Sequence, residues 1–184
     1  MTKYLKILHN SDIFPKSKIK KPKKYEKRET VKGIVLNKEG EIAIVTNPIH
    51  NLYLLPGGGA ESKNLELEIE RECLEEINYK VKIIGMIGKT KEFRDRDAKE
   101  YTTTCFVAKA EKKLTKDTRT KSEIENELKM VWVNKKKLKN IFEIQYKKVK
   151  AGKIKFYNTA FNIFRDSEFL KKYLNDLVKN KLKN

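Results

Sequence analysis

The segment 56–79, PGGGAESKNLELEIERECLEEINY, constrains the fold more than any other part of the 184-residue chain. Three glycines follow Pro56, and a helix is expected from about residue 64 to residue 77. At about 100° per residue, four apolar side chains of this helix fall on one arc roughly 120° wide: Leu65, Ile69, Cys73 and Ile77. An apolar stripe of this kind indicates a helix that packs on a sheet.

A neighbouring arc of the same helix, about 100° wide, carries Glu72, Glu75 and Glu76. Like charges one turn apart destabilise a helix by a few tenths of a kcal/mol, so a cation is expected to offset the repulsion. Mg²⁺ prefers oxygen ligands from one or two carboxylates together with substrate phosphates. The preceding glycines allow close approach of the backbone, and their carbonyls can add oxygen ligands. The segment therefore predicts a magnesium site.

The flanking segments predict strands mixed with helices. The ranges 30–36 and 41–46 are β-branched and apolar, and the turn residues between them predict a hairpin. Further strand-like segments lie at 81–89, 101–110 and 128–133, a short helical segment at 135–142, and a last helix at 159–177. Strand pairs mixed with separated helices predict an α/β sandwich with a mixed sheet.

Residues 1–27 are interpreted as a basic N-terminal extension, and residues 28–184 as a single domain that includes the C-terminal helix. Residues 4–8 have the composition of a short strand, whereas 16–28 is rich in lysine and contains Pro22. The basic stretch is interpreted as a solvated connector, with a phosphate-attracting arm as the alternative. We therefore expect that removal of residues 1–27 leaves the fold intact.

The charge and the composition limit the partners and the compartment. The formal net charge is +18, but 37 of the 43 basic residues are lysines spread along the whole chain. Nucleic-acid readers lean on arginine for bidentate contacts, so nucleic acid stays open but is not favoured. No apolar run is long enough for a membrane span, and no secretory signal pattern is present, which predicts a cytoplasmic protein. Cys73 and Cys105 are expected to be buried free thiols.

The segment 57–79 resembles the Nudix box, G-x5-E-x7-R-E-U-x-E-E-x-G-U, in which U is a bulky apolar residue. Gly57 opens the pattern, Arg71 and Glu72 match its R-E pair, and Glu75 and Glu76 match its E-E pair. The hairpin at 30–46 and the apolar run before the glycines also lie where Nudix domains have them. The resemblance covers roughly residues 28–142.

Two positions depart from the box. Lys63 stands where the first glutamate belongs, and Asn78 stands where the glycine belongs. Asn78 is a mild change, because asparagine tolerates the left-handed conformation that often ends a helix. In the family, the first glutamate mainly supports the loop and the arginine. The loop also looks one residue shorter than the usual form.

The resemblance implies a Nudix-type α/β/α sandwich and a magnesium-dependent pyrophosphohydrolase, with Mn²⁺ as a substitute metal. Such an enzyme cleaves the diphosphate linkage of a nucleoside diphosphate derivative with metal-activated water. Glu72 and Glu76 would be the chief metal ligands, and Glu75 a further ligand or the acceptor of a proton from water. Arg71 would orient these acids by charge-assisted hydrogen bonds, and the Gly57 carbonyl would complete the coordination.

Weaker candidates lie outside the box. Many Nudix enzymes use an acid from a late loop, and here Glu123 and Glu125 are favoured without preference between them. A solvated acidic turn is the alternative interpretation of these two residues. Arg94 is either a contact to substrate phosphate or part of a mixed-charge turn at 94–97.

Two other functions stay open at this point. A Nudix-fold module that binds a nucleotide without cutting it is motivated by Lys63, and an RNA-end-processing hydrolase by the net charge of +18. The sequence favours a small nucleotide-derived substrate and leaves its identity open. Many relatives dimerise, so a homodimer also stays open.

Overall fold

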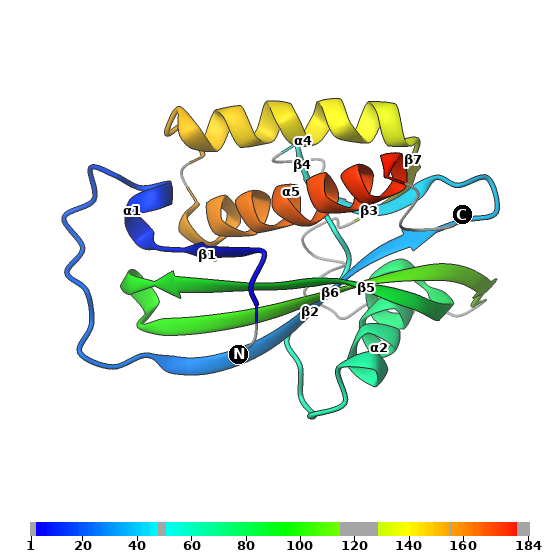
Figure 1. The fold of residues 1–184 in the computed structure, drawn as a ribbon, viewed down its shortest axis with the longest axis horizontal. Coiled ribbons are helices and arrows are strands. Elements are labelled where there is room, and N and C mark those ends of the chain that lie inside the picture. The colour runs from blue at the N-terminus through cyan, green and yellow to red at the C-terminus, as the bar shows by residue number, and fades with distance from the viewer. Residues whose placement is uncertain (1–2, 48–50, 115–128, 155, 180–184) are drawn as a thin grey trace.

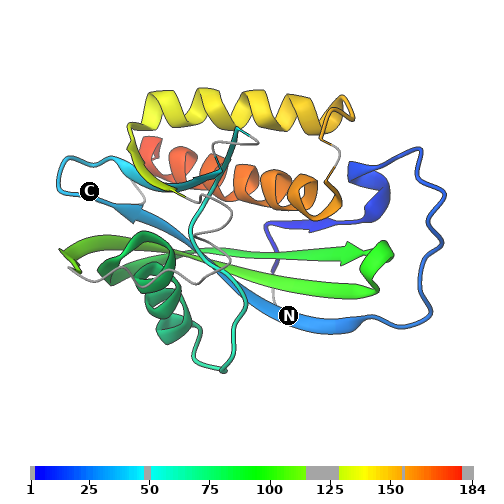
Figure 2. The same cartoon turned by 180° about the vertical axis from the view of Figure 1, so that it is seen from behind.

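The computed structural model describes residues 3–47, 51–114, 129–154 and 156–179. A twisted sheet forms the centre of the molecule, with α2 on one face and α4 and α5 on the other (Figure 1; Figure 2). In chain order the elements are β1 (Lys6–Leu8), α1 (Asn10–Ile13), β2 (Glu26–Leu36), β3 (Ile42–Asn47), β4 (Leu52–Leu54), α2 (Leu65–Ile77), β5 (Tyr79–Arg94), a 3-10 turn (Asp95–Asp97), β6 (Lys99–Lys113), β7 (Lys129–Val133), α4 (Lys135–Lys150) and α5 (Tyr157–Val178).

In the described part of the chain, the sheet has seven strands in the order β1-β5-β6-β2-β3-β4, with β7 paired to β3. β2 runs parallel to β6 along its whole length, β1 is parallel to β5, and β5 is antiparallel to β6. The expected hairpin of β2 and β3 is present, but the two strands meet at one pair, Leu36 and Ile42, whereas β3 pairs with β7 from Ile42 to Thr46. The predicted α/β sandwich with a mixed sheet is confirmed.

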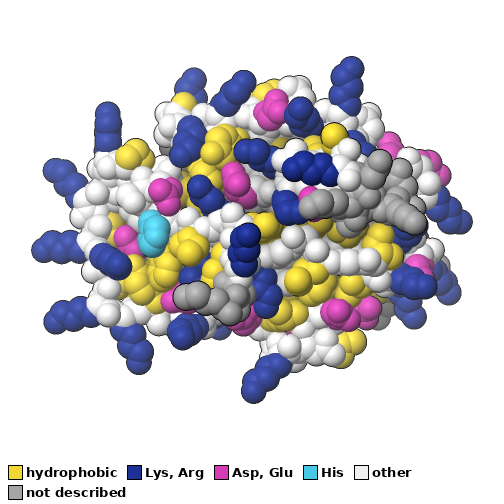
Figure 3. Space-filling model, viewed as in Figure 1, with side chains coloured by type: hydrophobic (Ala, Val, Ile, Leu, Met, Phe, Trp, Pro, Cys, Tyr) yellow, Lys and Arg dark blue, Asp and Glu magenta, His cyan; other side chains and the backbone are white. Residues whose placement is uncertain are grey.

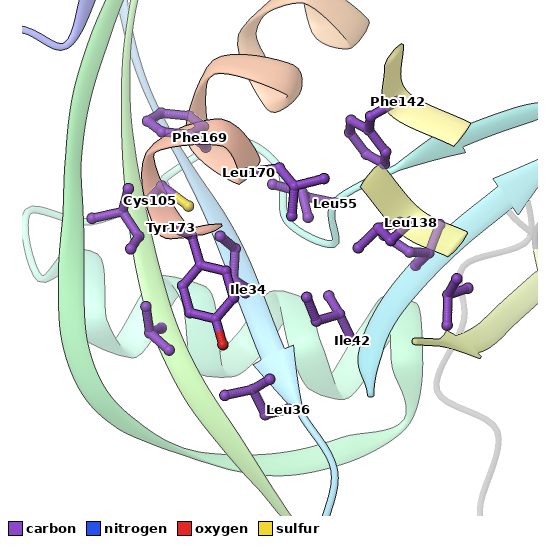
Figure 4. Close-up of a cluster of buried hydrophobic side chains, with 14 residues drawn as sticks. Ile34, Leu36, Ile42, Leu55, Cys105, Leu138, Phe142, Phe169, Leu170 and Tyr173 are labelled. Carbon is purple, nitrogen blue, oxygen red and sulfur yellow. The ribbon is translucent and has the colours of Figure 1, made fainter. Parts of the chain in front are cut away.

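The side chains of β2 alternate between two cores, as expected for a strand covered on both faces. Val31 and Val35 pack with Ile69, Cys73 and Ile77 of α2. Ile34 and Leu36 point to the other face. There they meet side chains of α4 and α5, among them Leu138, Phe142, Phe169, Leu170 and Tyr173 (Figure 4). β2 thus contributes side chains to both hydrophobic cores.

Helix α2 begins and ends where its sequence predicts. The Asn64 side chain caps the helix by accepting a hydrogen bond from the Leu67 amide. The expected apolar arc is buried at Ile69, Cys73 and Ile77. Asn78 closes the helix in the left-handed conformation with φ 62°, which explains why asparagine can stand in for glycine here.

Helix α4 is longer than the sequence predicts. Its buried face carries Leu138, Phe142, Gln145 and Val149, so the helical spacing continues beyond residue 142. Gln145 interrupts the apolar pattern, and its amide exchanges two hydrogen bonds of 2.9 Å with the backbone of Tyr53 in β4. A polar residue on the buried face therefore hid the second half of the helix from hydrophobic periodicity.

The N-terminal segment is divided in its packing. β1 extends the sheet beside β5, and Leu8 and Ile13 are buried in a core cluster with Phe161 of α5. Residues 15–24, by contrast, are mostly exposed, as expected for a connector. Residues 5–13 thus contact the sheet and α5, and the expectation that the fold stays intact without residues 1–27 remains a prediction.

Three further sequence-based expectations can be compared with the structure. Cys73 and Cys105 are buried free thiols, as expected. None of the described helices combines the length and the apolar character that crossing a membrane requires. On the face shown in Figure 3, Lys and Arg side chains project all around the outline and do not gather in one patch.

Candidate active site

The loop after β4 lies along β2 and admits no side chain at its first glycine. The amide of Val31 donates to the Gly58 carbonyl at 3.0 Å, and the amide of Gly33 donates to the Pro56 carbonyl at 2.9 Å. Gly57 has φ +125°, and a Cβ there would lie 2.3 Å from the Val31 carbonyl oxygen. The residue type at position 57 is therefore set by backbone geometry.

Glu72 presses its carboxylate against the second glycine of the loop. A Cβ on Gly58 would lie 2.6 Å from the Glu72 Oε2 atom. The Glu72 side chain is buried, and this burial raises the pKa of its carboxyl group, although Arg71 acts in the opposite direction. A cation near this carboxylate would favour its charged form.

Arg71 joins the acidic residues of the helix. Its Nη2 donates to Glu72 Oε1 at 2.7 Å, and its Nη1 donates to Glu75 Oε2 at 2.9 Å. Further bonds from the same guanidinium go to the Gly59 carbonyl at 3.0 Å and to Glu68. One rigid fork of donors thus fixes two of the expected site carboxylates and the loop at once.

Glu76 is held by the loop from the other side. Its Oε2 accepts a hydrogen bond of 2.5 Å from the Gly57 amide. Glu76 also lines a cavity of about 270 Å³ that is otherwise largely apolar. The remaining lining residues are Lys32, Val45, Asn47, Leu52, Leu54, Leu55, Phe156 and Thr159. A larger hollow of about 810 Å³ lies between α4 and α5 and includes no residue of α2 or of the glycine loop.

Lys32 is a residue of this site that the sequence reasoning missed. It lies on β2, and its buried ammonium donates to the Leu55 carbonyl at 2.8 Å and to the Gly57 carbonyl. The Gly57 carbonyl, which was expected to be a metal ligand, therefore accepts a hydrogen bond from the Lys32 ammonium group. The one available signal was a lysine inside the β-branched apolar run 30–36.

Asp166 fixes the strand end that leads into the loop. Its Oδ2 accepts a hydrogen bond of 3.0 Å from the Leu55 amide, and Arg165 lies beside it with Nε 2.9 Å from Oδ1. Arg165 and Arg94 both contact the fully buried Glu92 of β5. A buried cluster of two acids and two arginines thus ties the loop to α5 and β5.

The NUDIX domain profile matches residues 26–158 of this chain. The chain belongs to the Nudix family. The match spans the glycine loop, α2, the whole of β2 to β7 and α4. None of the curated proteins compared matches the chain.

Solved structures align with this chain at low sequence identity. A NUDIX hydrolase from Nitrosomonas europaea aligns with a TM-score of 0.50 and 12% identity, over 78% of this chain and 91% of the other. The E. coli ORF135 protein aligns with a TM-score of 0.47 and 14% identity, over 63% and 79%. The MutT protein from Methanosarcina mazei Go1 gives 0.47 and 17%, over 63% and 82%. The first of these likenesses shows the Nudix fold alone.

The Nudix box of this chain contains carboxylate and carbonyl oxygens of the kind that a hard cation binds. Among the described residues, no group of three or more His, Cys, Asp or Glu side chains is assembled that could hold a metal ion. Arg71 binds Glu72 and Glu75, and the Gly57 amide binds Glu76. The donor chemistry fits Mg²⁺, because carboxylates and a loop carbonyl are its preferred ligands.

Of the weaker candidates, the structure describes Arg94. Glu123 and Glu125 lie outside the described residues. Arg94 is buried, donates to Glu92, Asn158 and Asn162, and stacks over Tyr101. These contacts join β5 to α5 through Arg94, which agrees with the interpretation of Arg94 as a residue paired within the protein.

Proposed function

We propose that this Nudix protein hydrolyses the diphosphate linkage of a nucleoside diphosphate derivative with Mg²⁺, for which Mn²⁺ can substitute. One observation carries the proposal: Arg71 and the Gly57 amide hold Glu72, Glu75 and Glu76 beside the glycine loop, where Glu76 lines a cavity. The family is generally hydrolytic on phosphoanhydride bonds, and its substrates are derived from nucleotides. The cavity would receive the part of the substrate attached to the diphosphate.

Each residue of the site has a role in this proposal. Glu72 and Glu76 would hold the metal with the Gly57 carbonyl, and Glu75 would be a further ligand or accept a proton from the attacking water. When bound, the metal neutralises diphosphate charge and lowers the pKa of water. Arg71 keeps the carboxylates in place by charge-assisted hydrogen bonds.

Lys32 adds a fixed positive charge at the same place. An ammonium has three donors, and two of those on Lys32 go to the carbonyls of Leu55 and Gly57. Because Lys32 also lines the cavity, we assign its third donor to a phosphate oxygen of the substrate. Water adds to one phosphorus, the bridging P–O bond breaks, and each product leaves with a terminal phosphate.

A binding module without hydrolysis is the second candidate. It is favoured by the lack of an assembled metal group among the described residues and by Lys63 in the box. Tight binding of a nucleotide diphosphate without turnover in Mg²⁺ or Mn²⁺ would support the module. Turnover that disappears in excess chelator would support the hydrolase.

A hydrolysis screen tests the proposal and also addresses RNA ends. ADP-ribose-like sugars, dinucleoside polyphosphates, oxidised nucleoside triphosphates and 5′-triphosphate RNA are incubated with each metal, and products are identified. An RNA substrate would show an affinity that falls steeply with salt, because many phosphates are contacted. Full activity in excess chelator would contradict the metal-dependent mechanism.

Glu76→Gln is the matched variant for the screen. It keeps the side-chain shape and the acceptor for the Gly57 amide but removes the charge. We expect turnover to fall by at least about a hundredfold, because metal-activated water is lost. The rise in melting temperature on adding Mn²⁺ should shrink as well, since it depends on binding to the native state. Glu66→Gln, at an exposed position of α2, is the control and should behave as wild type.

A further inference from the structure

Glu68 accepts four hydrogen bonds, although it stands at a position that the box pattern leaves unspecified. Its Oε2 accepts from the Glu61 amide at 3.1 Å and from Arg71 Nε and Nη2 at 3.2 and 3.0 Å. Its Oε1 accepts from the Ser62 amide at 3.0 Å. The residue is 5% exposed, so this carboxylate is a buried junction between the loop and α2.

The position that the box reserves for a carboxylate cannot make such a junction in this chain. Lys63 is exposed, and an ammonium group only donates hydrogen bonds, so it cannot accept from Arg71 or from loop amides. Glu68 lies five residues later, inside the helix and one turn before Glu72. Because the loop folds back over the first turn of α2, this later position still reaches its amides.

We propose that Glu68 is a positioning residue that replaces the missing carboxylate at position 63. It closes the loop onto α2 and fixes the Arg71 guanidinium, which in turn aims Glu72 and Glu75. Its effect on turnover rests on the proposed hydrolase function, whereas its effect on the loop does not.

The charges at the junction are consistent with this role. Arg71 is the shared partner of Glu68, Glu72 and Glu75, so it carries three carboxylate contacts. Hydrogen bonding by Ser62 and by the Glu61 amide, together with Arg71, lowers the pKa of Glu68 to about 2. Glu68 therefore stays ionised at neutral pH, as an acceptor of four hydrogen bonds must.

The first test is Glu68→Gln, which keeps the side-chain shape. It replaces one acceptor oxygen by an NH₂ group that faces the hydrogen-bond donors of the loop and Arg71. We expect amide hydrogen exchange in residues 57–63 to become at least about tenfold faster, because local opening of the loop costs less. Turnover should fall about tenfold or more with little change in KM, since the aim of Glu72 and Glu75 is lost. Glu66→Gln is the control on the exposed side of the same turn.

The second test is rescue by Lys63→Glu. In the wild-type background the change should give no gain in turnover, because Glu68 already occupies the junction. In the Glu68→Gln background it should recover a large part of the lost turnover and slow the loop exchange again. If Glu68 had a purely structural role, Lys63→Glu would not restore turnover in the Glu68→Gln background.

The outcomes separate this inference from the proposed hydrolysis. If wild type hydrolyses none of the substrates, the proposed function fails. The positioning role of Glu68 is then still tested by amide hydrogen exchange in residues 57–63 and by Mn²⁺ binding, measured by electron paramagnetic resonance. Unchanged exchange in Glu68→Gln, or a gain from Lys63→Glu in the wild-type background, would overturn the replacement.

Discussion

Gly58 and Gly59 are neighbours in the loop, but they differ in the space that is available for a side chain. A Cβ at Gly58 would lie 2.6 Å from Glu72 Oε2, whereas a Cβ at Gly59 would meet nothing within 4 Å. The shape of the loop is thus matched to one carboxylate. This pairing gives a substitution experiment with a control one residue away.

Gly58→Ala should impair hydrolysis without unfolding the protein. The new methyl group must displace the Glu72 carboxylate, and a misplacement of about 1 Å can cost on the order of a hundredfold in rate. Gly59→Ala should retain nearly full turnover. Both variants are compared by kcat and by melting temperature. Equal losses of kcat in the two variants would show that loop flexibility, and not the position of the Glu72 carboxylate, limits the reaction.

The depressed pKa of Glu68 predicts a specific pH dependence of stability. The folded-state pKa is about 2 and the ordinary value is 4.5. A carboxyl group with a lowered pKa stabilises the fold above its unfolded pKa, and this contribution is lost as the pH falls through the folded value. Urea unfolding should therefore show that wild type exceeds Glu68→Gln in stability at pH 6, and that the difference shrinks between about pH 4.5 and 2. Glu66→Gln should show no such convergence.

At the scale of elements, the sequence predicted what depends on local spacing. The apolar arc of α2 and its end at Asn78 lie within one segment, so helical periodicity and the tolerance of asparagine for the left-handed conformation were sufficient. Lys32 and Leu55 are 23 residues apart, and Leu55 and Asp166 are 111 apart. Contacts of this kind depend on the pairing of strands and on α5, which local patterns do not encode. The proposed replacement of a carboxylate at position 63 by Glu68 could not be predicted for the same reason. Only the folded loop brings its amides to the Glu68 carboxylate.

The buried cluster around Asp166 predicts a large loss of stability when it is broken. Asp166 is fully buried between Arg165 and the Leu55 amide. Asp166→Asn leaves a buried arginine with less compensation, and breaking such a pair costs about 3 kcal/mol or more in free energy of unfolding. Glu143→Gln removes the partner of Lys139 in an exposed pair and should cost less than about 1 kcal/mol. Similar losses for the two variants in denaturant unfolding would contradict the account of this cluster.

At the scale of the whole molecule, the sheet joins segments from both ends of the chain. β1 lies at one edge beside β5, and α1 packs on α5, so residues near the N-terminus contact the last helix. Composition alone could not show this, because the apolar positions Leu5, Leu8 and Ile13 are separated from the rest by a lysine-rich connector. Even the backbone of β5 is adapted to the segment, since a Cβ at Gly88 would lie 2.9 Å from the Leu5 side chain.

Removal of residues 1–13 should therefore destabilise the protein, opposite to the expectation from composition. The deletion uncovers one edge of β5 and the α5 residues around Phe161, and it removes the buried side chains of Leu8 and Ile13. Leu8→Ala is the milder version and should cost about 2–5 kcal/mol in free energy of unfolding, as buried Leu→Ala changes do. Replacing Lys18, Lys20 and Lys21 of the exposed connector by glutamine is the control and should leave the unfolding midpoint nearly unchanged. The unfolding midpoints of the three variants and of wild type are compared in denaturant. A deletion variant that unfolds at the wild-type midpoint would show that β1 and α1 add nothing to the stability of the domain.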